Sequence, residues 1–249
     1  MTAAPARQRL LIPSVAAACA FAILIALGVW QVKRLAWKEA LIATVSERFA
    51  APPTALPPPS DWARLDPADD EFRRVTVSAA FVNDKEALVY TTGSSLRADS
   101  GPGYWVFAPA QFAGGTVMVN RGFVPEDHKD PATRRAGEIG GPVTIVGVMR
   151  WPEPPGLFTP AAEPAKNLWF SRDSTAIAAA KGVGPVSPFY IDLESPPPPG
   201  GFPLAGALQP AFPNNHLGYA ITWFGLAAVL AASFTVWAAG RRRQDSRQD

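Results

Sequence analysis

Two long stretches without a charged side chain, residues 10–32 and 217–239, constrain the fold of this chain more than any other feature. At about 1.5 Å per residue, a helix over either stretch reaches about 35 Å, which exceeds the roughly 30 Å hydrocarbon core of a membrane. We therefore expect each stretch to form a transmembrane helix.

The first stretch also has features of a signal peptide, because Arg7 and Arg9 precede its apolar run. However, the run is longer than the apolar region of most signal peptides, and Trp30-Gln31 is not a small-residue cleavage site. We therefore expect an uncleaved membrane anchor.

Basic residues predict the orientation of the two helices. The arginines at 241–243 directly follow the second stretch, and no Lys or Arg lies between Lys181 and this cluster. Since basic residues favour the cytoplasmic side, we expect both chain ends in the cytoplasm and the intervening segment in the periplasm. Lys33, Arg34 and Lys38 oppose this orientation, but the three consecutive arginines outweigh them.

The charge of the segment between the helices excludes one class of partner. The whole chain has net charge +2, but six of its 23 basic residues and only two of its 21 acidic residues lie outside residues 33–216, so that segment carries −2. Nucleic-acid binding depends on a basic surface, which this segment lacks. The predicted parts are a cytoplasmic tail (1–9), a transmembrane helix (10–32), a periplasmic domain (33–216), a second transmembrane helix (217–239) and a basic cytoplasmic tail (240–249).

The scarcity of Cys and His limits the chemistry open to this chain. Cys19 is its only cysteine, and His128 and His216 are its only histidines. A disulfide framework and a zinc site built from several imidazoles are therefore excluded. The sequence contains no nucleophile elbow, phosphate-binding loop or dinucleotide-binding motif. We therefore expect a protein that is not an enzyme.

Alternating apolar residues and turn signals predict a β-rich domain between the membrane helices. Gly114-Gly115 marks the clearest hairpin, and Asn83-Asp84 is expected to join another pair of strands. The expected strands cover residues 75–81, 86–92, 104–112, 116–123, 143–149 and 186–193.

Helices and connectors complete the expected fold. The first membrane helix should continue to Phe49 and end before Pro52, and a short helix is expected over 174–181 with Asp173 as its N-cap. The prolines at 196–199 predict an extended connector back to the membrane. The fold class is therefore an α+β membrane protein, with two transmembrane helices flanking a mainly antiparallel β-sheet or small barrel outside the cytoplasm.

His216 is the side chain best placed to bind a ligand, because it directly precedes the second membrane stretch. Its neutral imidazole could ligate a haem iron, with Tyr219 and Trp223, at i+3 and i+7, as one wall of the pocket. The alternative is an interfacial polar residue within an aromatic belt. Spacing alone does not decide between the two interpretations.

Other polar residues also allow two interpretations. Gln31, Arg34 and Lys38 lie at the end of the first stretch and could contact haem propionates or lipid phosphates, although anchoring to lipid headgroups is the ordinary role of such residues. Asn120-Arg121-Gly122 indicates either a turn that needs Gly or a buried arginine with an ion-pair or anion contact. His128 lies among charged residues, so we expect a solvated loop there.

Three groups of residues, in order along the chain, resemble motifs of the Surfeit-locus cytochrome c oxidase assembly family. They are Gly28-Val29-Trp30-Gln31 with Arg34 and Trp37-Lys38, then Gly103-Tyr104 followed by Val119-Asn120-Arg121-Gly122-Phe123-Val124-Pro125, and finally Asn215-His216-Leu217-Gly218-Tyr219-Ala220 with Thr222-Trp223-Phe224. Their order and the two-span topology make the resemblance specific over nearly the whole chain. Ala80 and Phe123 depart from it, since Gly and Trp are usual at these positions in the family.

The resemblance implies a bacterial inner-membrane assembly factor that binds haem a and assists its insertion into oxidase subunit I. It implies His216 as the haem ligand, and we expect Tyr219 and Trp223 in the pocket wall and Arg34 beside a propionate. The expected partners are subunit I, the haem a synthesis enzymes and membrane lipids. The short segment before Leu10 lacks a transit peptide, which favours a bacterial member.

Two other functions compete with haem binding. The first is a membrane-tethered scaffold that binds no haem and holds oxidase subunits through its β-domain. The second is an enzyme that modifies haem or lipid, for which the sequence offers no plausible base or nucleophile.

Overall fold

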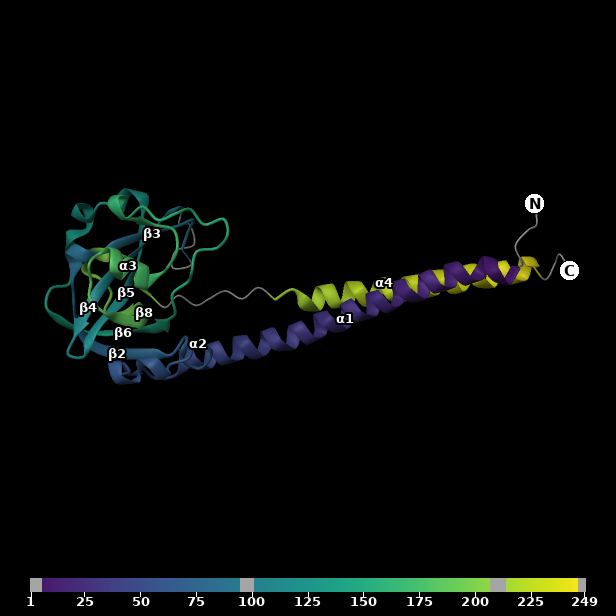
Figure 1. Ribbon diagram of the computed structural model, residues 1–249, viewed down its shortest axis with the longest axis horizontal. Helices are drawn as coiled ribbons and strands as arrows, with labels where there is room; N and C mark the ends of the chain where they lie inside the picture. Colours follow the sequence, from purple (N-terminus) through teal and green to yellow (C-terminus); the bar gives the residue numbers. More distant parts are fainter. Residues whose placement is uncertain (1–5, 95–100, 207–213, 246–249) are drawn as a thin grey trace. The chain divides into compact units, whose positions relative to one another are not determined.

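The computed structural model describes residues 6–94, 101–206 and 214–245, and the chain divides into two compact units (Figure 1). The helical unit comprises Met1–Thr44 and Ala211–Asp249. The β unit comprises Val45–Pro210. Residues 33–44, which we expected in the domain, group with the helical unit because the first helix continues through them.

The helical unit is built from α1 (Ala6–Ala50) and α4 (His216–Asp245), which lie side by side (Figure 1). Both helices are long and apolar enough to cross a membrane. The two expected long apolar helices are therefore confirmed. α1 ends shortly before Pro52, as predicted, because Pro cannot continue the helical hydrogen bonds.

α1 and α4 pack closely in antiparallel directions. Gly28 contacts Phe224, and Gln31, further along α1, contacts His216, which lies earlier in α4. A Cβ atom on Gly28 would lie 2.6 Å from Cε1 of Phe224. Small residues allow such close approach, and within a membrane this packing is a main source of helix association.

Among the described residues, the β unit contains eight strands, two short α-helices, six short 3₁₀ helices and the last turns of α1. The strands are β1 (Thr54–Ala55), β2 (Arg74–Phe81), β3 (Ala87–Thr91), β4 (Gly103–Phe112), β5 (Gly115–Pro125), β6 (Pro142–Arg150), β7 (Leu168–Trp169) and β8 (Val186–Ser195), and the α-helices are α2 (Pro67–Asp70) and α3 (Ser174–Ala180).

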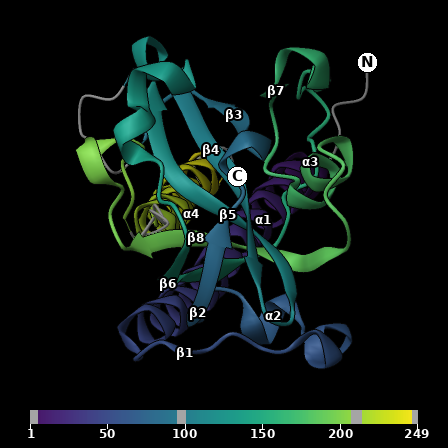
Figure 2. The ribbon, with the colours of Figure 1, turned by 90° about the vertical axis from the view of Figure 1, so that its left-hand side faces the viewer.

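Five of these strands close into a barrel (Figure 2). Their order around the ring is β2, β6, β8, β5, β4, and β4 then pairs with β2 through Ala80–Gln111 and Phe81–Ala110. β5 and β8 are parallel, while the other neighbours in the ring are antiparallel. The predicted mainly antiparallel barrel is confirmed. This ring order is that of the OB fold, which hosts many functions and identifies none.

The predicted hairpin at Asn83-Asp84 is wrong, although both of its strands exist. β3 pairs with β4 and β7 instead of β2. One edge of β2 is occupied by β6 along its length, and the other pairs with β1 at its start and β4 at its end. β3 therefore pairs with the first half of β4, on the edge of β4 that faces away from β5 and whose end pairs with β2.

The interior of the barrel is the main hydrophobic core, to which every barrel strand contributes. Its fully buried side chains include Val75, Ala108, Val119, Ile145 and Ile191. A second core lies where α3 packs its Ile177 against residues of β4, β5 and β8. The predicted N-cap of α3 is confirmed, since Asp173 Oδ1 accepts a hydrogen bond from Ala176 N at 3.0 Å.

After β8 the chain returns to the barrel, so the expectation that the prolines at 196–199 lead the chain back to the membrane is wrong. Leu204 exchanges two backbone hydrogen bonds with Phe123, at 2.8 and 3.0 Å. Gly122, beside this pair, has a φ of 124°, and a Cβ atom there would lie 2.1 Å from the Leu204 oxygen. The expected turn at Gly122 is wrong, because Gly122 lies within β5. Glycine is needed there for another reason, since only glycine fits this close approach.

Replacing Gly122 by alanine is expected to lower the free energy of unfolding by about 2–4 kcal/mol, since the positive φ and the Leu204 carbonyl both exclude a side chain. Gly141→Ala is the control, because Gly141 also has a positive φ of 73° but no atom lies within 4 Å of the position that a Cβ atom would occupy. Denaturant unfolding of the two variants in detergent measures the difference. Equal losses would contradict the contact with Leu204.

Candidate functional site

His216 and Gln31 meet where α4 begins. Nδ1 of His216 lies 2.7 Å from Oε1 of Gln31, and both residues belong to the helical unit. Gln31 is only 8% exposed, while His216 is half-buried. The sequence marked both residues as candidates but did not pair them, because the pairing results from the packing of α1 against α4.

The aromatic residues expected around His216 differ in exposure. Trp223 is half-buried and lies on the same face of α4 as His216 and the buried Ala220. Tyr219 is 56% exposed, one turn after His216. The exposed ring of Tyr219 is therefore available to contact lipid or a bound ligand.

Arg34 lies about one turn of α1 beyond Gln31. Its Cζ atom is 3.8 Å from the ring centroid of Trp37, and both side chains are exposed. A guanidinium that stacks on an aromatic ring keeps its N–H groups in its own plane available to an anion. Arg34 is therefore suited to bind a carboxylate or phosphate.

These side chains fit a haem better than a bare metal ion. A neutral imidazole can ligate haem iron, a guanidinium can bind a propionate, and aromatic rings can pack against the porphyrin. Across the described part of the chain, no group of three or more His, Cys, Asp or Glu residues could hold a metal ion. A single histidine is nevertheless sufficient as a protein ligand to haem.

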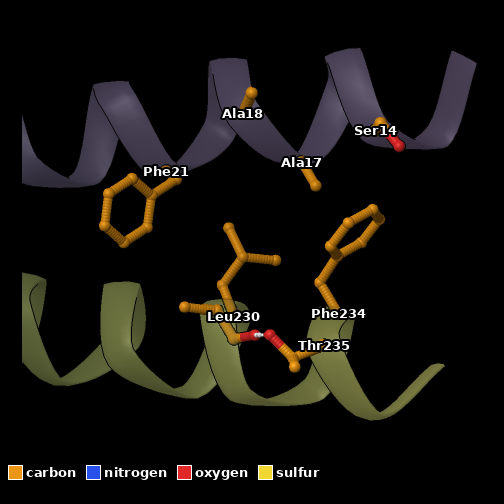
Figure 3. Close-up of a pocket in the computed structure, with 8 residues that line it drawn as sticks. Ser14, Ala17, Ala18, Phe21, Leu230, Phe234 and Thr235 are labelled. Carbon is orange, nitrogen blue, oxygen red and sulfur yellow. Dashed lines mark hydrogen bonds between the residues drawn. The ribbon is translucent and has the colours of Figure 1, made fainter. Parts of the chain in front are cut away.

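The helical unit also contains an apolar cleft of about 270 Å³ between α1 and α4 (Figure 3). Phe21 of α1 lies across from Leu230 of α4, and Ala17 lies across from Phe234. Along each helix, these residues lie several turns from Gln31 and His216. The cleft is therefore separate from the site around His216.

Asn120 belongs to a buried polar cluster of the β unit. Its Nδ2 donates a hydrogen bond to Asp192 Oδ1 at 2.8 Å, and Arg150 Nη1 lies 3.5 Å from Asp192 Oδ2. Burial raises the pKa of Asp192, and the nearby Arg150 opposes that rise. The cluster joins β5, β6 and β8, so we interpret Asn120 as a structural residue.

Arg121 is also structural, and it is 1% exposed. Its guanidinium donates hydrogen bonds to Asn83 Oδ1 at 3.0 Å and to the Gly137 carbonyl at 2.5 Å. Burial lowers the pKa of Arg121, while the charge of Glu86 opposes this shift. The predicted buried arginine is present, but both of its acceptors are neutral.

A buried ion pair that the sequence did not reveal also lies in this region, and its two charges act on Arg121 in opposite directions. Arg134 donates to both carboxylate oxygens of Glu86, at 2.9 and 2.5 Å. The side chains of Arg134 and Glu86 are 4% and 9% exposed. No sequence signal marks this pair, because its members lie on separate loops that the fold brings together.

The expectation of a solvated His128 is wrong. Its ring stacks on Phe202 with the centroids 4.2 Å apart, and its carbonyl accepts a hydrogen bond from Arg134 Nε at 3.0 Å. The returning segment after β8 supplies Phe202, which local sequence cannot predict. His128 belongs to the β unit, whereas His216 belongs to the helical unit.

The residues of the sequence motifs thus fall into two groups. Gly28, Gln31 and the 55% exposed Trp30 lie in the helical unit, as His216 does. Asn120, Arg121 and Gly122 support the barrel of the β unit. Only the first group lies in the same unit as His216, the candidate haem ligand.

Comparison with known proteins extends over both units. The SURF1 family matches this chain over residues 18–228. A SURF1-like protein of Monosiga brevicollis is 36% identical over 231 residues, which cover 89% of this chain and 84% of the relative. Surfeit locus protein 1 of Homo sapiens is 34% identical over 216 residues, which cover 81% of this chain and 69% of the relative.

Proposed function

This chain belongs to the SURF1 family, which takes part in the assembly of cytochrome c oxidase, and we propose that it holds haem a on the helical unit and assists its insertion into oxidase subunit I. In this role the protein acts as a chaperone rather than as an enzyme. The proposed partners are subunit I, the enzymes of haem a synthesis and membrane lipids.

The observation that carries this proposal is the arrangement around His216. Gln31 occupies Nδ1 of the ring at 2.7 Å. The other ring nitrogen, Nε2, is then the one suited to bind a metal, because a histidine ligand commonly engages its second nitrogen in a hydrogen bond. The half-buried position at the start of an apolar helix also lowers the local polarity, as haem sites require.

Each candidate residue would have a distinct role toward the haem. His216 would ligate through Nε2, Arg34 would bind a propionate, and Tyr219 and Trp223 would contact the apolar ring. Haem a, when bound, supplies the redox-active iron that the mature oxidase uses. The protein's own contribution is to hold this group in a low-polarity environment and to release it to a partner.

The proposed location is a bacterial inner membrane. The antiparallel contacts of α1 and α4 support chain ends on one side, and the arginines at 241–243 favour the cytoplasm for that side. The β unit would then lie in the periplasm.

Deletion of the gene tests the proposed function. We expect less haem a per subunit I in oxidase purified from the deletion strain, with recovery when the wild-type gene is returned. The ratio is measured from the haem absorbance and the amount of subunit I. An unchanged haem a content of the oxidase from the deletion strain would contradict the proposed function.

Exposed apolar residues favour a second candidate, a scaffold that holds oxidase subunits without binding haem. Leu157 and Phe158, in the loop between β6 and β7, are 92% and 93% exposed. Large exposed apolar side chains next to each other are typical of contact sites. Full restoration of oxidase by His216→Ala, together with failure of a Leu157→Ser/Phe158→Ser variant, would favour the scaffold.

A further inference from the structure

The atoms that join Gln31 to His216 specify which ring nitrogen carries hydrogen. The contact of 2.7 Å runs from Nδ1 of the imidazole to Oε1 of the amide. With the Gln31 amide oriented so that its oxygen faces the ring, that oxygen accepts and Nδ1 is the donor. A neutral imidazole has one N–H group, and Nε2 therefore keeps its lone pair.

We propose that Gln31 is a positioning residue that holds His216 in the Nδ1–H tautomer and presents Nε2 as the ligand atom. The identity of the ligand, haem a, rests on the proposed function. The tautomer itself does not, because it follows from a contact between two side chains of this protein.

The surroundings of Gln31 make this contact well defined. Gln31 is 8% exposed and lies about one turn after Gly28, whose close approach to Phe224 sets the separation of the two helices. A buried hydrogen bond in an apolar environment is stronger than one in water, and an unpaired amide there is costly. Both effects favour a single orientation of the imidazole.

Such a contact has a known effect on metal ligands. A hydrogen bond to the second ring nitrogen fixes the tautomer and ring orientation and raises the basicity of the coordinating nitrogen. Loss of a contact of this kind typically lowers metal affinity by about 10- to 100-fold. If Gln31 served only to join the two helices, its loss would change their packing but not the tautomer of His216.

Nitrogen NMR of the haem-free protein reads the tautomer directly. In a His128→Ala background with no histidine tag, ¹⁵N-histidine labels His216 alone, because the chain has two histidines. At a pH where the ring is neutral, we expect protonated Nδ1 and unprotonated Nε2. The Gln31→Leu variant should lose this preference. Protonated Nε2 in the parent protein, or an unchanged pattern in Gln31→Leu, would overturn the inference.

Haem a titration of the full chain in detergent provides the second readout. We expect Gln31→Leu to weaken binding by about 10- to 100-fold and Gln31→Glu to restore it, because a carboxylate can accept the same hydrogen bond. Thr222→Val is the matched control, since it removes an α4 hydroxyl that donates a hydrogen bond to Gly218 O at 3.0 Å within the same helix. Affinity equal to that of the parent in Gln31→Leu would overturn the positioning role.

Failure of the proposed function and failure of the positioning role of Gln31 give different experimental results. If the parent protein binds no haem a, the proposed function fails, while the NMR result still decides whether Gln31 sets the tautomer. If the parent binds haem a and Gln31→Leu binds it equally well, haem binding stands and the role of Gln31 is wrong.

Discussion

Replacing His216 by alanine is expected to lower haem a affinity by more than about a hundredfold. Removal of the iron ligand itself should weaken binding more than removal of Gln31, the residue that hydrogen-bonds to this ligand. Alanine has no atom that can bind iron, and the side chains proposed around the haem contact its ring and propionates rather than the metal. Arg34, Tyr219 and Trp223 would remain, so residual weak binding is expected. The measurement is haem absorbance per protein after purification from cells that synthesise haem a.

His128→Ala is the matched control for this experiment. It removes the other histidine, which stacks on Phe202 in the β unit. We expect normal haem a content in this variant and unchanged helical circular dichroism in both. If His216→Ala retains the haem absorbance of the wild type, the ligand assignment is wrong.

Replacing Glu86 by alanine should destabilise the β unit by about 3–5 kcal/mol, because it leaves a buried cation without its partner. Arg134 is 4% exposed and would lose both of its carboxylate contacts. The buried Arg121 would also lose a compensating negative charge. Denaturant unfolding followed by tryptophan fluorescence measures the loss.

An exposed ion pair provides the comparison. Lys166 and Glu163 form a pair with side chains 73% and 43% exposed, and such surface pairs contribute roughly 0–1 kcal/mol. Glu163→Ala should therefore have a small effect. The double variant Glu86→Leu/Arg134→Met should recover much of the stability, since it removes both buried charges. A loss in Glu86→Ala no larger than in Glu163→Ala would contradict the role of this pair.

Local patterns predicted most elements of the β unit and the hairpin of β4 and β5 at Gly114-Gly115, but not the pairing of strands that are distant in sequence. The alternation around Val75 and the glycines at 114–115 identified strands because burial and turn chemistry act over a few residues. The partner of β3 depended instead on which strand edges remained free after β2 had paired with β6 and β4. The return of Leu204 to Phe123 was likewise invisible, since it joins distant segments.

The candidate site followed the same division. His216 was predictable because histidine is rare in this chain and lies directly before an apolar stretch. Its contact with Gln31 spans 185 residues of sequence, so only the packing of α1 against α4 reveals it. Glu86 and Arg134, 48 residues apart, were hidden for the same reason.

The most direct test of haem a binding is the absorbance spectrum of the wild-type protein, purified in detergent from cells that make haem a. We expect a Soret band and, after the haem iron is reduced, the α band of haem a. Their intensities should correspond to an amount of haem a comparable to that of the protein. The same preparation from cells without haem a synthesis should lack these bands. A protein that remains free of haem a absorbance when haem a is available would contradict the central claim.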